Sequence, residues 1–237
     1  YIRRLDEMLK SSVAEDLFKP LAEYIDKISQ KRYNGVIYYN RAYYMVRYAE
    51  DANGVMQRVA KDPTPFCRTY AINVAENSKG ADRGAVKYIV FDEFITRKNY
   101  ITNEFVHFQN LLSSIIRDRD NVKIYMLANT VNQYCPYFAE MGLKEIDTMQ
   151  QGEIAVYKVG QTKTKIAVEY CATASATRKV SKYFAFDNPQ LQMITNGAWE
   201  VALYRKAPDM AKYDIIFSFF IIIYYIIIIS FLRRFLL

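Results

Sequence analysis

The chain has 237 residues, of which 51% are hydrophobic and 24% are charged, a balance typical of a globular protein rather than a disordered one. It carries 32 lysines and arginines against 25 acidic residues, so its formal net charge is +7. A basic excess of this size suits a polyanionic partner such as nucleic acid but does not require one.

The cysteines and the single histidine argue against several classes of site. Cys67, Cys135 and Cys171 lie far apart in no Cys-x-x-Cys spacing, so neither a disulfide framework nor a zinc site is supported, and a reducing compartment fits. His107 is the only histidine, which gives a histidine-dependent catalytic triad little support. The first residue is Tyr1 rather than methionine, and we expect that an N-terminal piece is missing.

The first part of the chain predicts a strand end followed by helices. Tyr1–Arg4 is expected to be the end of a strand, with two arginines as its last residues. Apolar residues recur at helical spacing through Leu5–Gln30, and Pro20 is expected to open a second helix there.

Shorter β-rich runs come next. Val36–Tyr39 and Tyr43–Tyr48 flank a three-residue link, which predicts a β-hairpin. Thr69–Val74 is expected to be a strand, and 77–84 a polar loop that leads into the centre of the chain.

The stretch Val86–Glu104 organises the rest. Tyr88–Phe91 is a continuous apolar run, as in a strand buried on both faces, and Asp92 and Glu93 follow it directly. The carboxyl edge of a parallel sheet is where α/β proteins bind ligands, so this is the form of a Walker B segment. Asp92 would hold Mg²⁺ and Glu93 would activate the water that attacks a γ-phosphate. A buried strand followed by an ordinary acidic turn is the alternative interpretation.

A helix and a second strand complete the pattern. Glu104–Arg117 has one broad apolar face, and Val122–Leu127 is another buried-strand pattern. A strand, a helix and a strand in this order predict a parallel βαβ unit. Asn129 would then lie at the same sheet edge as the two carboxylates, unless it is simply a turn asparagine.

The C-terminal part is less regular. Glu153–Val159 predicts a strand, and Lys163–Phe184 is expected to be mostly helix. Ile215–Leu232 is almost uninterrupted apolar sequence and ends at Arg233–Arg234. It could begin a further domain, result from an out-of-frame translation, or span a membrane, and a membrane span is the least favoured of these.

Several short motifs between Tyr88 and Phe138 carry a resemblance to a known family. They are Phe-Asp-Glu-Phe-Ile, Asn-Tyr-Ile-x-Asn-Glu, Arg-x-Arg, Leu-x-Asn and Pro-Tyr-Phe. In combination they resemble the encapsidation proteins of small podoviruses, the DNA-packaging ATPases that act as terminase large subunits. Weaker similarity extends upstream to Tyr1–Arg4 and to Ser78–Lys79.

The resemblance implies an α/β fold of the P-loop NTPase type: a parallel sheet flanked by helices, with an inserted β-hairpin, here truncated at the N-terminus. It implies binding of ATP and Mg²⁺, with Asp92 as metal ligand and Glu93 as catalytic glutamate. Arg3 and Arg4 match basic residues near the nucleotide.

Two further positions are assigned through the same resemblance. Arg117 matches an arginine finger that reaches a neighbouring subunit, with Arg119 as its alternative, and Asn129 matches a coupling residue. Either arginine could instead cap the end of a helix.

The family's activity implies the partners and the location of the protein. The expected partners are double-stranded viral DNA, the capsid portal and further copies of the chain in a ring. The expected location is the cytoplasm of the host, transiently at the portal, and a membrane partner is not favoured.

One departure from the family is serious. No G-x-x-x-x-G-K-[ST] motif occurs, since Gly80 and Gly84 lead to Lys87 with the wrong spacing. We therefore expect a partial ATPase domain over 1–160 that hydrolyses ATP poorly or not at all alone. A linker or lid would follow over 161–214, and then the apolar tail, 215–237. The alternatives are a non-catalytic, basic DNA-binding or scaffold module and, less favoured, a membrane-anchored protein.

Overall fold

The computed structural model describes residues 1–78, 85–117, 119–129, 135–161 and 164–171. Contacts divide the chain into Tyr1–Val201 and Ala202–Leu237, and the second unit lies wholly outside the described residues. The predicted apolar tail and the greater part of the predicted helix Lys163–Phe184 also lie outside the described residues. Within the described ranges, no helix is long and apolar enough to cross a membrane.

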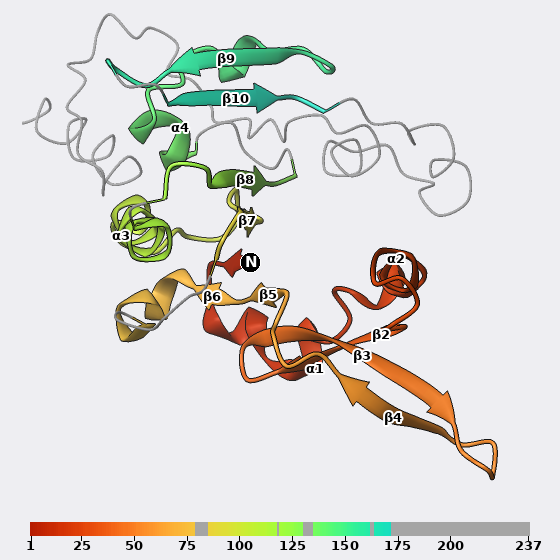
Figure 1. Ribbon diagram of the computed structural model, residues 1–237. Coiled ribbons are helices and arrows are strands. Elements are labelled where there is room, and N and C mark those ends of the chain that lie inside the picture. The colour runs from red at the N-terminus through yellow and green to blue at the C-terminus, as the bar shows by residue number, and fades with distance from the viewer. Residues whose placement is uncertain (79–84, 118, 130–134, 162–163, 172–237) are drawn as a thin grey trace, which may run out of the picture. The chain divides into compact units, whose positions relative to one another are not determined.

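A four-stranded parallel sheet confirms the predicted architecture around residues 88–127 (Figure 1). Its strands run in the order β6 (Tyr70–Ala71), β1 (Ile2–Arg3), β7 (Tyr88–Asp92) and β8 (Lys123–Leu127). Ile2 pairs with Phe91, and Asp92 pairs with Leu127. The carboxyl ends of β1, β7 and β8 therefore meet at one edge of the sheet.

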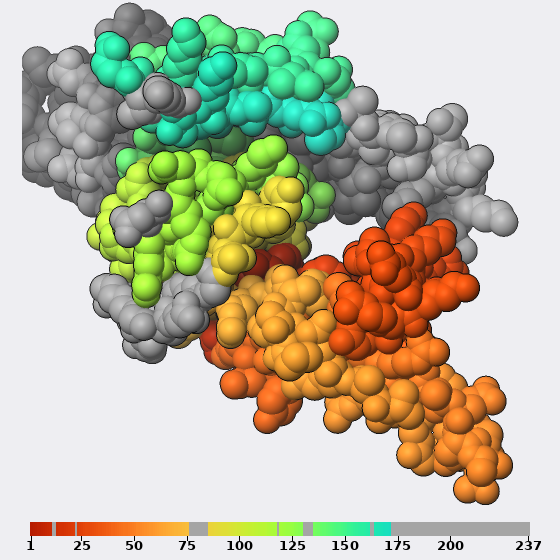
Figure 2. All heavy atoms as spheres, in the orientation of Figure 1, coloured from red at the N-terminus to blue at the C-terminus, as the bar shows by residue number. Residues whose placement is uncertain are grey.

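The connection between β7 and β8 is the predicted helix. This helix, α3 (Glu104–Ile116), buries Phe108, Leu111 and Ile115 in the same core cluster as Ile89 of β7. Atoms of β7 (yellow) and α3 (yellow-green) lie side by side in Figure 2. Burying side chains of this size stabilises the fold by about 1.5–3 kcal/mol each, so α3 and β7 hold each other in place through this core.

Aromatic rings hold the centre of this core. Phe91 is fully buried, and its ring centroid lies 5.1 Å from that of Phe108 and 5.7 Å from that of Tyr137. Tyr137 comes from the short helix α4 (Pro136–Glu140), which begins at the proline. Rings from α3 and α4 thus converge on the strand that carries Asp92.

An antiparallel sheet forms a second group of strands. β2 (Gly35–Tyr39) and β3 (Ala42–Glu50) make the predicted hairpin, whose turn residues Asn40 and Arg41 have φ values of 48° and 59°. Two positive φ values are the signature of a tight hairpin turn. The sheet also contains β4 (Met56–Lys61) and β5 (Cys67–Arg68), both paired with β3.

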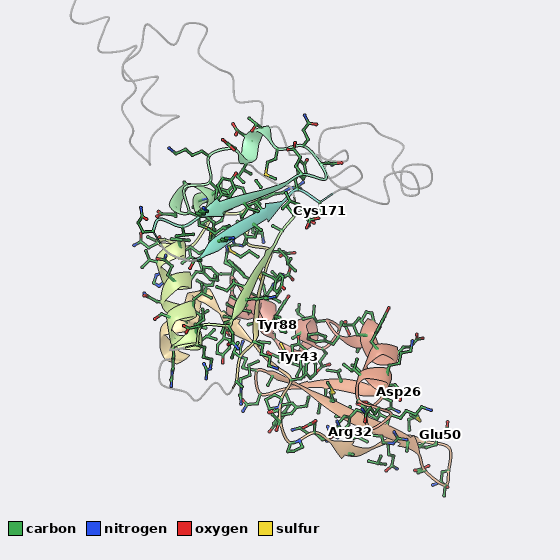
Figure 3. The ribbon with its side chains drawn as sticks, turned by 45° about the horizontal axis from the view of Figure 1, so that its top comes forward. Asp26, Arg32, Tyr43, Glu50, Tyr88 and Cys171 are labelled. Carbon is green, nitrogen blue, oxygen red and sulfur yellow. The ribbon has the colours of Figure 1, made fainter. Side chains whose placement is uncertain are left out.

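The predicted helical stretch Leu5–Gln30 is broken into four short pieces. They are η1 (Asp6–Leu9), α1 (Ser11–Ala14), η2 (Lys19–Leu21) and α2 (Ala22–Ile28). The hydroxyl of Tyr38 donates to Leu9 O at 2.9 Å, and that of Tyr43, labelled in Figure 3, donates to Ala14 O at 2.7 Å. These tertiary bonds engage carbonyls at the ends of two of the pieces.

Two other predictions need correction. Only Tyr70–Ala71 of the predicted strand Thr69–Val74 is in a strand, because the chain turns into η3 (Ile72–Ser78), which packs against α3. Part of the predicted helix 163–184 is a strand, β10 (Lys165–Glu169).

The partner of β10 is β9 (Ile154–Lys158), which confirms the strand predicted there. Ile166 and Val168 of β10 alternate with exposed residues and pack against the core cluster. This two-residue period requires a strand. A short 3₁₀ helix, η4 (Ile146–Thr148), precedes the pair.

Candidate active site at the carboxyl edge of the parallel sheet

Arg3 bridges the two carboxylates that end β7. Its Nη1 lies 2.6 Å from Asp92 Oδ2, and its Nη2 lies 2.8 Å from Glu93 Oε2. The hydroxyl of Tyr1 also donates to Asp92 Oδ2, at 2.6 Å. β1 and β7 are parallel neighbours with Ile2 beside Phe91, so the next residues on each strand, Arg3 and Asp92, are brought together by register alone.

This cluster is open to solvent to different degrees. The side chains of Arg3, Asp92 and Glu93 are 15%, 30% and 51% exposed. Burial raises the pKa of the Tyr1 phenol, and the hydrogen bond to Asp92 raises it further, so Tyr1 stays protonated and acts as a donor. A cationic group already sits against Asp92, which shows that this edge accommodates positive charge.

The residues present fit a magnesium ion. Mg²⁺ in nucleotide sites is commonly held by one or two carboxylates together with waters and phosphate oxygens, and does not need a cage of protein ligands. Asp92 supplies such a carboxylate at a sheet edge. Among the described residues there is no group of three or more acidic, histidine or cysteine side chains that could hold a metal ion.

The backbone at Glu93 is unusual. Its φ is 58°, in the left-handed region that a non-glycine residue rarely adopts. The turn directs the chain out of β7, and the next amide, Phe94 N, donates to Leu127 O of β8 at 3.2 Å. Backbone strain of this kind costs about 1–3 kcal/mol and persists only where the surroundings enforce it.

Arg4 does not join the ion-pair cluster of Arg3, Asp92 and Glu93, and its predicted position near a nucleotide stays a prediction. Arg4 is 4% exposed, and its Nε lies 2.8 Å from Oε2 of Glu104, which is 3% exposed. Its Nη1 donates to Glu93 O at 3.0 Å and its Nη2 to Phe94 O at 2.7 Å. All three nitrogens are engaged inside the protein, because successive strand residues point to opposite faces and Arg4 points inward.

Glu104 is a functional candidate that our sequence reasoning left without a role. Its Oε1 accepts a 2.8 Å bond from the Tyr137 hydroxyl, and its Oε2 accepts one of 2.9 Å from Ile101 N. The Arg4 guanidinium also lies 5.1 Å from the ring centroid of Tyr100. The signal was present in the motifs, since Asn-Tyr-Ile-x-Asn-Glu and Pro-Tyr-Phe contain these partners.

Asn129 lies at the predicted edge. It follows β8 by two residues, and the last residue of β8, Leu127, pairs with Asp92. Asn129 is exposed. Its amide is therefore available at the edge that carries Asp92 and Glu93.

Arg117 lies toward the amino ends of the strands, opposite the end that carries Asp92 and Glu93. It is the exposed C-cap residue of α3, the helix that returns the chain to the start of β8. Arg119 caps that helix, since its Nη1 donates to Ile115 O at 2.9 Å, as the helix-cap alternative predicts. Arg117 is thus remote from Asp92 and Glu93 of its own chain, and an arginine-finger role requires a second subunit.

The fold and this edge define a mixed α/β protein with acidic residues at the carboxyl end of a parallel strand. Residues 67–158 match the family described as Podovirus DNA encapsidation protein (Gp16). The resemblance seen in the sequence is thereby confirmed over a segment that contains Asp92, Glu93, Arg117 and Asn129.

Curated relatives support the same conclusion. The DNA packaging proteins of Bacillus phages PZA and phi29 are each 39% identical to this chain over 70 residues, which is 28% of the chain. The matched segment spans about a fifth of these relatives, 21% of each.

A solved structure shows the fold. The N-terminal domain of the DNA packaging ATPase from bacteriophage phi29 superposes with a TM-score of 0.50 at 23% identity, covering 67% of this chain and 70% of that one.

Proposed function

We propose that this chain is part of a motor that uses ATP to drive viral double-stranded DNA into a preformed capsid. The observation that carries the proposal is the position of Asp92 and Glu93, which end the central parallel strand within the segment that matches the encapsidation family. In this proposal Asp92 holds Mg²⁺, and Glu93 orients or activates the attacking water. The bound ion supplies charge neutralisation at the β- and γ-phosphates.

Other predicted residues act around that pair. Arg3 releases the carboxylates when Mg²⁺ and nucleotide enter, and its guanidinium is then available to phosphate oxygens. Asn129, at the same edge, transmits the state of the bound nucleotide to β8, the strand that precedes it. Arg117, toward the opposite ends of the strands, reaches the nucleotide of a neighbouring copy, which requires a ring of subunits at the capsid portal.

The phosphate-binding loop is the part that this sequence does not supply. The outer strand β8 exposes Ile124, Tyr125 and Leu127 by 40%, 47% and 50%. Apolar side chains on an edge strand are a liability unless another element covers them. A further strand along β8 would bring a phosphate-binding loop beside Asp92, so we propose that the chain alone hydrolyses ATP poorly and represents the acidic half of the site.

The experiment compares the chain alone with the chain extended at its amino end by a strand, a phosphate-binding loop and a helix. We expect no hydrolysis from the first and Mg²⁺-dependent hydrolysis from the second. Glu93→Gln in the extended chain should lower the turnover rate about 100-fold or more while ATP still binds. An extended chain that binds ATP and is indifferent to Glu93→Gln would overturn the proposal.

A non-catalytic DNA-binding module is the second candidate, favoured by the net charge of +7 and the missing motif. Such a module would bind duplex DNA with affinity that falls steeply as salt is raised. Its binding would not respond to ATP in the extended chain, whereas a motor subunit's would.

A further inference from the structure

The side chain of Arg4 grips two successive peptide carbonyls at the end of β7. Nη1 donates to Glu93 O at 3.0 Å, and Nη2 donates to Phe94 O at 2.7 Å. Arg4 lies one residue beyond the last paired residue of β1, so its guanidinium reaches the neighbouring strand's turn from inside the protein. The two carbonyls converge on one planar group, which fixes the orientation of both peptide planes.

The peptide that Arg4 grips is the strained one. Glu93 has φ 58°, which its own side chain disfavours. The Glu93 side chain is 51% exposed, and its ion-pair partner, Arg3, is itself partly exposed. Arg4 itself is 4% exposed, so its bonds to the backbone are well placed to enforce this turn.

Arg4 is in turn held by Glu104. Nε lies 3.0 and 2.8 Å from the two carboxylate oxygens of Glu104, both side chains being almost fully buried. Glu104 is oriented by Tyr137 of α4 and by the amide of Ile101 just before α3. The turn at Glu93 is thus tied to the start of α3 and to α4 by hydrogen bonds that run through the buried Arg4–Glu104 pair.

We propose that Arg4 and Glu104 are positioning residues that set the backbone of Glu93 and thereby aim its carboxylate at the attacking water. The inference rests on the proposed role of Glu93 in ATP hydrolysis. Neither Arg4 nor Glu104 touches the nucleotide in this arrangement. Their effect is transmitted through the peptide groups of Glu93 and Phe94.

The first experiment needs no ATP and uses the chain itself. Glutamate labelled with ¹³C at the carbonyl is incorporated, and the signal of Glu93 is identified by its loss in Glu93→Gln. Arg4→Lys keeps a positive charge near Glu104 but lacks the planar fork that donates to Glu104 and to both carbonyls together. We expect the Glu93 carbonyl signal to shift in Arg4→Lys while the chain remains folded.

Two variants separate positioning from general destabilisation. Tyr137→Phe removes one hydrogen bond to Glu104 and should move the Glu93 signal in the same direction by a smaller amount. Leu111→Ala opens a cavity in the same core without touching the Arg4–Glu104 pair, and it should leave the signal where it is. If Arg4→Lys fails to fold, the comparison of Tyr137→Phe with Leu111→Ala still decides the matter.

The second experiment measures hydrolysis in the chain extended with a P-loop strand and helix. Arg4→Lys should lower kcat about 10-fold or more with KM for ATP nearly unchanged, because Glu93 acts on water rather than on binding. An unshifted Glu93 signal in a folded Arg4→Lys or Tyr137→Phe chain overturns the positioning role. An extended wild-type chain without hydrolysis overturns the proposed function, and the carbonyl measurement remains interpretable.

Discussion

Arg3 and Arg4 are neighbours at the end of one short strand, yet they bind carboxylates in opposite environments. Arg3 bridges Asp92 and Glu93 at an edge open to solvent, whereas Arg4 is sealed against Glu104 under the same edge. An exposed ion pair is worth little and exchanges partners easily, while a buried pair is costly to break. We therefore expect Arg3 to exchange its carboxylate partners for a ligand, and Arg4 to stay paired with Glu104.

The largest effect expected from this difference is on stability. Glu104→Ala would leave the charge of Arg4 buried without its partner, which should lower the free energy of unfolding by about 3–5 kcal/mol. The measurement is denaturant unfolding followed by circular dichroism. Asp6→Ala is the matched control, since it removes the partner of Arg41 from a pair whose side chains are 29% and 45% exposed.

The control should lose only about 0–1 kcal/mol, the usual worth of an exposed pair. Equal losses for Glu104→Ala and Asp6→Ala would show that burial does not distinguish the two kinds of pair in this protein.

Cys135 reports whether the buried cluster opens. It is 4% exposed and lies 3.4 Å from the Tyr100 hydroxyl, while Cys171, labelled in Figure 3, is exposed. Burial raises the pKa of the Cys135 thiol, so the reactive thiolate is scarce in the folded chain. We expect iodoacetamide to modify Cys135 on the order of 100-fold more slowly than Cys171, because reaction requires local opening.

The pH dependence follows from the sign of that shift. Because burial raises the pKa of the Cys135 thiol, its modification should stay slow to a higher pH than that of an ordinary thiol, with the exposed Cys171 as the reference. Mass spectrometry of the modified peptides measures both rates in one sample. Similar rates in the folded chain would mean that the cluster around Arg4 and Glu104 is not closed, and Glu104→Ala should produce that behaviour.

The βαβ unit could be predicted because its elements carry strong, local signals. Apolar patterns in the sequence indicate burial for three elements: the run before Asp92, the helix 104–117 and the strand after it. Their parallel arrangement follows from their order. The edge position of Asp92, Glu93 and Asn129 required nothing more. The register that places Arg3 beside Asp92 could not be predicted from the sequence, because the pairing between β1 and β7 joins residues far apart in the chain.

The remaining errors have a common physical cause, which is tertiary contact. The helical spacing in 5–30 did not give long helices, because carbonyls there are engaged by hydroxyls of Tyr38 and Tyr43. β4 is exposed at every residue and has no burial pattern to read, so only its pairing with β3 defines it. The inward position of Arg4 likewise depended on Glu104, a residue 100 positions away.

A smaller effect is expected from Arg3, on metal binding rather than on folding. Arg3→Gln removes a positive charge from between two carboxylates, so a divalent cation no longer competes with it. We expect Mn²⁺, used as a probe for Mg²⁺, to bind several-fold more tightly, a gain of about 1 kcal/mol. Electron paramagnetic resonance of free Mn²⁺ gives the affinity.

Arg41→Gln is the matched control for Arg3→Gln because it makes the same change in net charge within the exposed Asp6 pair. An affinity for Mn²⁺ that rises equally in both variants would reflect overall charge alone. It would then remove the argument that Arg3 stands where the cation belongs.

The smallest expected effect lies in the turn between β3 and β4, where an acidic side chain binds backbone amides instead of an arginine. Asp51 Oδ1 accepts bonds from Val55 N at 3.0 Å and Asn53 N at 2.9 Å, and these bonds lower the pKa of the Asp51 carboxyl. A carboxyl whose pKa is lowered in the folded chain stabilises the turn at pH values above the ordinary aspartate range. This stabilisation is lost as pH falls through the pKa of the folded chain. The amide signals of Asn53 and Val55 should therefore titrate together, with a midpoint below that of a free aspartate. Asp51→Asn should abolish this titration, and a midpoint at or above the ordinary value would show that even this exposed carboxylate is not held by its amides.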